Sequence, residues 1–159
     1  MKKYYLAYGS NLNVSQMQHR CPTAMVIGTA EIKDYELLFK GSMTGSYLTI
    51  EKAKDKTVPV AVWEVQQQDE LSLDRYEGFP SFYYKKEMEI EYTGIRTHRK
   101  RKVKAFVYIM HEDRPFGIPS QHYVETCLTG YRTFDFDTKI LYNAIYESKV
   151  RINENNKFC

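Results

Sequence analysis

Cysteine is scarce in this chain of 159 residues, and the three that occur, Cys21, Cys127 and Cys159, form no CxxC pair. An odd and widely spaced set is not a disulfide framework, and it favours a reducing compartment. The four histidines are scattered too, and none stands at a ligand spacing from another histidine or from a cysteine. We therefore expect no metal site and a cytoplasmic location.

Long apolar runs are also missing. After Lys2 and Lys3 the chain is rich in tyrosine, and Gly9 then interrupts it. It therefore has neither the apolar core of a signal peptide nor a membrane-spanning segment, and we expect no membrane partner.

Charge of one sign is not in large excess, because the formal net charge is only +3. A nucleic-acid-binding domain concentrates many more basic residues on one face. Most of the excess lies in residues 96–104, a run without interleaved aromatic residues. We interpret this run as a solvated hairpin tip. Contact with nucleic acid is the alternative, but no nucleic-acid partner is expected.

Glycine-rich phosphate loops are absent. The turn Gly9-Ser10-Asn11 is too short, and has too few glycines, for a P-loop or a dinucleotide-binding loop. Ser10 does not stand in a GxSxG elbow, and Cys127 belongs to an apolar stripe at helical spacing, where a thiol packs inertly. The sequence therefore predicts no cofactor and no covalent nucleophile.

Aromatic residues, by contrast, make up 14% of the chain, and 14 residues are tyrosine. Tyrosine suits half-buried strands and pocket walls that are apolar but carry hydroxyl groups. At this length we expect one domain, residues 1–150, followed by a polar tail, residues 151–159.

Strand and helix patterns follow one another along the chain, which predicts an α+β domain. The expected strands cover residues 4–8, 24–30, 34–39, 46–51, 58–65, 82–92 and 103–110, and the expected helices cover residues 13–20, 67–77, 120–130 and 137–149. The charged residues 52–56 are interpreted as the turn of a hairpin formed by the strands on either side, and Gly130 as the end of its helix.

The first strand stops abruptly at Gly9-Ser10-Asn11, and a helix begins soon after. Asn13 is placed as its N-cap and Gln16 at the capping-box position. A strand, a tight turn and a helix start aim several backbone N–H groups at one point, which suits a carboxylate or a developing oxyanion. The alternative is an ordinary connection between a strand and a helix.

One carboxylate stands apart, because Glu77 falls in the last turn of its expected helix. The helix dipole, the charge of Asp74 one turn earlier, and the aromatic neighbours Tyr76 and Phe79 would all raise its pKa. A glutamate with a pKa near neutrality can accept a proton and return it. The alternative is an exposed glutamate before a C-cap glycine.

Three motifs occur in a fixed order along the chain. They are Tyr8-Gly9-Ser10-Asn11-Leu12, then Leu73-Asp74-x-x-Glu77-Gly78, then Pro119-Ser120-x-x-Tyr123 ahead of Gly130. Together they resemble the γ-glutamylcyclotransferase-like family, and the resemblance extends from Lys3 to about Thr133.

This resemblance implies a compact α+β domain with a small mixed β-barrel-like sheet flanked by short helices. It implies that the turn residues Tyr8, Gly9, Ser10, Asn11 and Leu12 bind substrate, largely through backbone groups. It also implies that Glu77 is the general acid/base. Two further pocket residues are implied, Tyr123 and Tyr84, although Tyr83 competes with Tyr84 for this place. Residues 79–82 depart from some members of the family, at a position where substrate specificity would be set.

The implied reaction needs no metal, nucleotide or covalent nucleophile. The α-amine of a γ-glutamyl compound attacks its own γ-carbonyl, and 5-oxoproline forms as the attached amine or amino acid leaves. Both reacting groups belong to one molecule, so holding the folded rotamer supplies much of the acceleration. A small γ-glutamyl molecule is therefore the expected partner. A binding module that keeps the cavity without catalysis is the alternative.

Overall fold

Five strands close into a barrel in the order β1-β3-β2-β4-β5, and β5 returns to pair with β1. The computed structural model describes residues 2–42 and 44–156. Its strands are β1 (Lys3–Ala7), β2 (Met25–Ser42), β3 (Gly45–Val65), β4 (Tyr83–Gly94) and β5 (Lys100–Met110). The β1–β5 pair is parallel and the other four are antiparallel, which confirms the predicted α+β class with a small mixed barrel.

β2 and β3 are each one long strand, where the sequence predicted two. They pair with each other from Met25–Glu64 to Ser42–Gly45. The expected hairpin with its turn at residues 52–56 is therefore wrong. Residues 53–56 form a bulge opposite Asp34, where Asp34 and Asp55 take positive φ and the Asp55 N–H donates to Asp34 Oδ1. A bulge absorbs extra residues and lets the pairing continue. The predicted loop at residues 41–45 includes residue 43, which lies outside the described residues.

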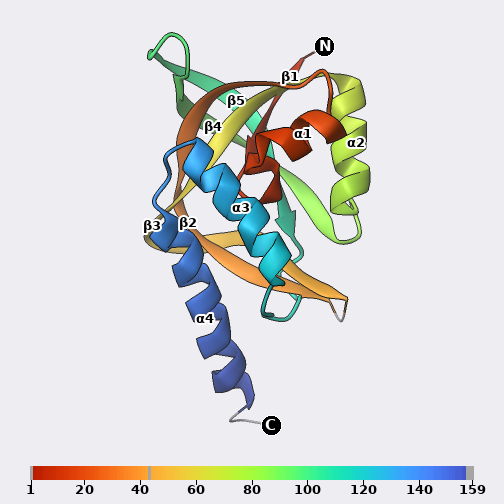
Figure 1. The fold of residues 1–159 in the computed structure, drawn as a ribbon, viewed down its shortest axis with the longest axis vertical. Coiled ribbons are helices and arrows are strands. Elements are labelled where there is room, and N and C mark those ends of the chain that lie inside the picture. Colours follow the sequence, from red (N-terminus) through yellow and green to blue (C-terminus); the bar gives the residue numbers. More distant parts are fainter. Residues whose placement is uncertain (1, 43, 157–159) are drawn as a thin grey trace.

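A 3-10 turn and four α-helices accompany the barrel. They are η1 (Ser10–Leu12), α1 (Val14–Arg20), α2 (Gln67–Glu77), α3 (Gln121–Thr133) and α4 (Thr138–Asn156). α1 and α3 lie across one face of the barrel, α2 lies at its side, and α4 extends away from it towards the C-terminus (Figure 1). The predicted N-caps are confirmed, because the Asn13 side chain accepts from the Gln16 N–H and the Ser120 side chain accepts from the Tyr123 N–H. No helix of the described residues is long and apolar enough to cross a membrane.

Two predicted helix ends differ from the structure. α3 continues past Gly130 to Thr133, because that glycine serves close packing against Leu12 rather than chain reversal. α4 continues through residue 150 to Asn156, so the predicted start of a polar tail lies inside a helix. Arg151 in this last part forms an ion pair of 2.9 Å with Glu36 on β2. The remaining tail residues, 157–159, lie outside the described residues.

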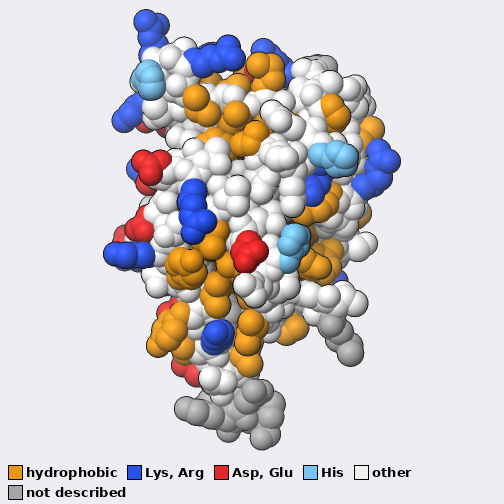
Figure 2. All heavy atoms as spheres, viewed as in Figure 1, with side chains coloured by type: hydrophobic (Ala, Val, Ile, Leu, Met, Phe, Trp, Pro, Cys, Tyr) orange, Lys and Arg blue, Asp and Glu red, His pale blue; other side chains and the backbone are white. Residues whose placement is uncertain are grey.

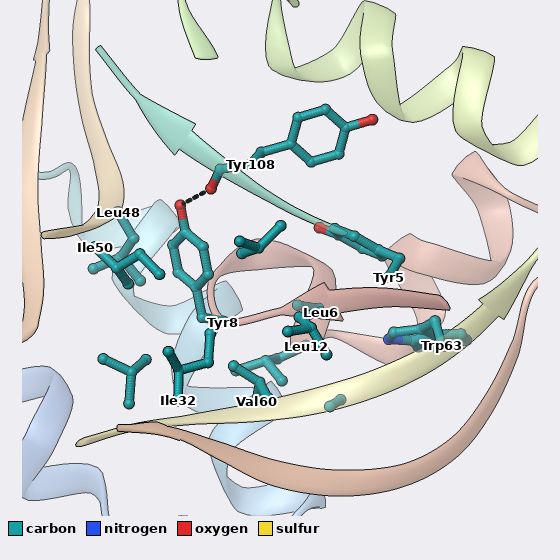
Figure 3. Close-up of a cluster of buried hydrophobic side chains, with 14 of the residues drawn as sticks. Tyr5, Leu6, Tyr8, Leu12, Ile32, Leu48, Ile50, Val60, Trp63 and Tyr108 are labelled. Atoms are coloured by element: carbon teal, nitrogen blue, oxygen red, sulfur yellow. Dashed lines mark hydrogen bonds between the residues drawn. The ribbon is translucent and has the colours of Figure 1, made fainter. Parts of the chain in front are cut away.

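The barrel interior is filled by large side chains from the paired strands (Figure 3). Trp63, Leu6 and Phe39 are almost completely buried. Leu6 pairs with Val62 and Trp63 pairs with Tyr5, so Leu6 and Trp63 point to opposite sides of the sheet, and both sides are covered. The packed interior makes the barrel a rigid scaffold, and the chemistry is left to the cavity at one end of β1.

The basic run lies on the hairpin between β4 and β5. Lys102 and Lys104 stand opposite Glu91 and Glu89 in the antiparallel register, so part of the positive charge faces carboxylates across the ladder. The remaining basic side chains gather at the hairpin tip, where Figure 2 shows Lys, Arg and His together. This arrangement agrees with the interpretation as a solvated tip.

Candidate active site

A cavity of about 420 Å³ opens where the end of β1, the end of α2 and the start of α3 meet the β2–β3 hairpin. Its wall is unusually rich in phenol rings. Seven tyrosines line it: Tyr5, Tyr8, Tyr47, Tyr76, Tyr83, Tyr108 and Tyr123. The polar lining also includes Ser10, Asn11, Ser42, Thr44, Arg75 and Glu77. A volume of this size lies in the range typical of small-molecule sites.

The turn after β1 is built as a 3-10 helix. Leu12 N–H donates to the Gly9 carbonyl at 3.0 Å, and Asn13 N–H donates to the Ser10 carbonyl at 3.0 Å. The amides of Ser10 and Asn11 come before any intrahelical acceptor, and no described residue accepts a hydrogen bond from either. Both residues line the cavity, so the two unpaired N–H groups belong to residues of its wall.

Gly9 stands at a close approach. A Cβ atom at this position would lie 3.2 Å from the Tyr123 hydroxyl, tighter than most such contacts. Leu12 has a different place from the one that the resemblance implied. It is fully buried behind the turn, against Gly130, and does not belong to the cavity wall. Its side chain anchors the turn.

Most of the tyrosine hydroxyls are engaged by the protein itself. Tyr8 donates to the Tyr108 carbonyl at 2.6 Å, as Figure 3 shows. Tyr83 donates to the Leu48 carbonyl at 2.7 Å, and the Leu48 N–H donates to the Tyr123 hydroxyl at 3.2 Å. These hydroxyls take the place of a neighbouring strand for Leu48, because β1 ends before it reaches that level. The tyrosines therefore fix the shape of the cavity.

Of the two adjacent tyrosines on β4, Tyr83 lines the cavity. Tyr84 does not, and it points to the opposite side of the strand, where its hydroxyl donates to Glu112 at 2.7 Å. The placement of Tyr84 in the pocket is therefore corrected to Tyr83. Tyr123 is in the cavity wall, as the resemblance implied.

Glu77 reaches the cavity from the last turn of α2, and Gly78 ends that helix in the left-handed conformation with φ 63°. The Glu77 carboxyl has no hydrogen bond or ion pair with any described residue. Burial raises the pKa of this carboxyl from its ordinary 4.5 to about 8, and the charge of Arg20 opposes the rise. One cavity thus contains a carboxyl group with a pKa of about 8 and the two turn residues whose amides are unpaired.

Asp74 does not act on Glu77 as the sequence predicted. It forms an ion pair of 2.8 Å with Lys85 and accepts a hydrogen bond of 2.6 Å from the Tyr108 hydroxyl. Its charge is therefore satisfied on the side of α2 that faces β5. Burial, the third of the expected influences, is the one that dominates.

Sequence reasoning missed Arg20 and three of the seven tyrosines, Tyr5, Tyr47 and Tyr108. Arg20 donates to the Asn11 side chain and lies over the Tyr76 ring, 3.4 Å from its centroid. Its position at the end of the first helix, just before Cys21-Pro22, gave no signal of a partner 56 residues later. The high tyrosine content did indicate a hydroxyl-bearing pocket, but it did not say which residues form it.

No three His, Cys, Asp or Glu side chains among residues 2–42 and 44–156 gather closely enough to hold an ion.

Comparison with known proteins agrees with this geometry. The family model described as "Gamma-glutamyl cyclotransferase, AIG2-like" matches residues 5–125, which include the turn, Glu77 and Tyr123. The chain belongs to this family. The match confirms the resemblance and includes every residue that lines the cavity.

Two curated relatives carry the same name. The chain is 31% identical to the γ-glutamylcyclotransferase of Bos taurus over 135 residues, 79% of this chain and 68% of the relative. It is 27% identical to that of Mus musculus over 163 residues, 97% of this chain and 80% of the relative. A solved structure named "Gamma-glutamyl cyclotransferase" superposes with a TM-score of 0.72 at 23% identity, covering 91% of this chain and 86% of that one. That structure supports the fold.

Proposed function

We propose that the protein is a γ-glutamylcyclotransferase-type enzyme that converts a γ-glutamyl amine or dipeptide into 5-oxoproline and the free amine or amino acid. The observation that carries the proposal is the Glu77 carboxyl, with a pKa of about 8 and no bonded partner in the described chain, in one cavity with the unpaired turn amides. Curated relatives that bear the name of this activity support it.

In the first step Glu77 takes a proton from the substrate α-ammonium, and the amine nitrogen attacks the γ-carbonyl carbon. The new C–N bond closes a five-membered ring, and the carbonyl oxygen becomes an oxyanion. Amide N–H groups of Ser10 or Asn11 can donate to this oxygen or to the substrate carboxylate. Preorganised donors of this kind stabilise charge as it develops.

In the second step the oxyanion collapses and the original amide C–N bond breaks. The protonated Glu77 gives its proton to the leaving nitrogen, and its carboxylate then takes the second proton, which the ring nitrogen must lose to become the lactam N–H. The released amine takes up that second proton, so the carboxylate is regenerated and both protons lost by the α-ammonium leave with the amine. A pKa near the working pH suits both transfers, because the group must lose and gain a proton in one turnover.

The free thiols Cys21 and Cys127 are both buried and unpaired, which is compatible with our proposal of a cytoplasmic enzyme. A cavity lined by aromatic rings and hydroxyls accommodates a small γ-glutamyl compound. The leaving group would extend towards the β2–β3 hairpin, where Tyr47 and Thr44 form the wall.

The test is release of 5-oxoproline from a panel of γ-glutamyl amino acids, γ-glutamyl amines, glutathione and an Nε-(γ-glutamyl)lysine isopeptide. Glu77→Gln keeps the shape of the side chain but removes the base, so kcat should fall by about 10² to 10⁴. Glu125→Gln is the matched control, because Glu125 is an exposed carboxylate on α3 outside the cavity wall.

A Glu77→Gln enzyme with turnover near wild type would contradict the assignment of Glu77 as the general acid/base. Binding of γ-glutamyl compounds by folded wild-type protein, without release of 5-oxoproline from any of them, would instead indicate a binding module on this fold.

A further inference from the structure

Arg20, the last residue of α1, stands at the junction of the two parts that make the site. Its Nη1 donates to Asn11 Oδ1, and its guanidinium lies flat enough over the Tyr76 ring to place Cζ 3.4 Å from the centroid. Asn11 belongs to the turn, whereas Tyr76 is the residue before Glu77 on α2. One side chain therefore contacts both the binding turn and the helix of the proton carrier.

The contacts close into a ring. Asn11 Nδ2 donates to the Tyr5 hydroxyl at 3.0 Å, so both ends of the Asn11 amide are engaged. Ser10, the next residue in the turn, has its hydroxyl 2.8 Å from the Tyr76 hydroxyl. Starting at Arg20, the path runs to Asn11, along the backbone to Ser10, across to Tyr76 and back to the guanidinium. A closed set of contacts resists relative motion of its members more than an open chain does.

We propose that Arg20 is a positioning residue, which clamps the Ser10–Asn11 turn to Tyr76 and so fixes the turn amides relative to the carboxyl group of Glu77. Arg20 itself does not belong to the cavity wall, so it acts through its partners. The role in turnover rests on the proposed cyclotransferase function, but the clamp itself does not.

The electrostatic surroundings of Glu77 give Arg20 a second effect. Burial raises the pKa of the Glu77 carboxyl, and Arg20 is the charged group that opposes this rise. The other groups that face Glu77 come from β1 and the residue after it, from β4, from β5 and from α3. They are the phenols of Tyr5, Tyr8, Tyr83, Tyr108 and Tyr123, each with a pKa raised by burial and therefore neutral. On α2 itself, Asp74 is paired with Lys85, and Arg75 is exposed at the cavity mouth.

Two substitutions separate the geometry from the charge. Arg20→Lys keeps a positive charge but loses the planar guanidinium that stacks on Tyr76. Arg20→Gln loses the charge but can still donate a hydrogen bond to Asn11. Arg132 on α3 is exposed, and Arg132→Lys and Arg132→Gln are the matched controls.

The experiment combines kinetics with ¹³C NMR titration of the Glu77 carboxyl and amide shifts of the turn. In Arg20→Lys we expect kcat/KM to fall at least about tenfold, with the pKa of Glu77 within about 0.3 unit of wild type. In Arg20→Gln we expect the pKa of Glu77 to rise by about half a unit or more, and the acid limb of the kcat/KM profile to move with it. Thermal melts of each variant report the folded fraction.

An Arg20→Lys enzyme within twofold of wild-type kcat/KM would overturn the proposal. A loss of activity that merely follows the unfolded fraction would overturn it too, because a structural residue does the same. If Arg20→Gln does not fold, Arg20→Lys carries the test through kinetics and the amide shifts.

Failure of the proposed function has a different signature. If wild-type protein releases no 5-oxoproline from any panel compound, the NMR measurements test the positioning role of Arg20 without the kinetics. Shifts of the Ser10 and Asn11 amides in Arg20→Lys, together with a raised pKa of Glu77 in Arg20→Gln, would support it. Unchanged amides and an unchanged pKa would dismiss it.

Discussion

The hydroxyl oxygens of Ser10 and Tyr76 lie 2.8 Å apart and join the turn after β1 to the last turn of α2. Tyr76 is 44% exposed, so its position depends on a few contacts rather than on burial in the core. Arg20 covers one face of its ring, and the hydrogen bond to Ser10 fixes its edge. Substitutions at Tyr76, the residue before Glu77, therefore test the connection between α2 and the turn.

Tyr76→Phe removes the hydroxyl and leaves the ring under Arg20. We expect kcat/KM to fall about threefold to tenfold, while the free energy of unfolding changes by about 1 kcal/mol or less, the usual net value of one hydrogen bond. Ser10→Ala should cost a similar factor, and the double variant should be little worse than either single one, because both break the same bond. Steady-state kinetics on the four proteins checks this. Multiplicative losses in the double variant would mean that the two hydroxyls act separately.

The raised pKa of Glu77 also predicts how stability depends on pH. Between the ordinary value of 4.5 and about 8, the carboxyl is ionised in the unfolded chain but still protonated in the folded one. The folded state then binds more protons, so stability should be greatest below about pH 4.5 for this group and should fall as pH rises towards 8. Glu77→Gln removes the effect and should therefore gain stability over wild type as pH rises, by at most about 1.4 kcal/mol per pH unit.

Urea denaturation of both proteins between pH 5 and pH 8 measures this gap. The carboxylates of Glu36 and Glu70 titrate below this pH range. Burial alone would raise the pKa of each, but their basic partners lower it, so the stability they contribute is lost only at lower pH. In kinetics, the acid limb of kcat/KM should lie near pH 8 for the same reason. Parallel stability curves would show that Glu77 is ionised normally in the folded protein.

Tyr83 and Tyr84 should differ sharply when each loses its hydroxyl. Tyr83→Phe leaves the buried Leu48 carbonyl without its donor, so we expect the free energy of unfolding to fall by about 1–3 kcal/mol and KM to rise. Tyr84→Phe breaks only a bond to the exposed Glu112, and kcat/KM should stay within about twofold of wild type. The pair is its own control, since the residues are adjacent and the substitution is the same. If Tyr84→Phe lowers kcat/KM more than Tyr83→Phe does, the assignment of Tyr83 to the pocket is wrong.

Local signals were sufficient for the parts of the site that depend on neighbouring residues. α2 has the predicted bounds because Asp69 caps the Gln66 N–H at its start and Gly78 takes the left-handed conformation at its end. The turn before α1 was predicted for the same reason, since Asn13 caps the Gln16 N–H. Caps act within four residues, so the sequence alone contains them.

Contacts between distant segments could not be predicted in this way. The stacking of Arg20 on Tyr76 depends on how α1 packs beside α2, and the choice of Tyr83 over Tyr84 depends on the register of β4. The continuity of β3 depends on a bulge that only the pairing with β2 reveals. In each case a short pattern fits two arrangements, and the barrel selects one.

Gly130 gives the last prediction, because helix propensity and packing oppose each other there. Inside an exposed helix, Gly→Ala would add about 1 kcal/mol of stability. A Cβ at Gly130, however, would lie 2.4 Å from Leu12 Cβ and 2.5 Å from the Leu12 carbonyl carbon, so backbone must move. We expect Gly130→Ala to destabilise the protein by about 1–3 kcal/mol and to lower kcat/KM, since Leu12 anchors the binding turn. Thr129→Ala, on the exposed face of the same helix, should cost little in thermal and urea denaturation. A Gly130→Ala protein as stable as wild type would show that the turn can shift without cost, and that α3 does not set its position.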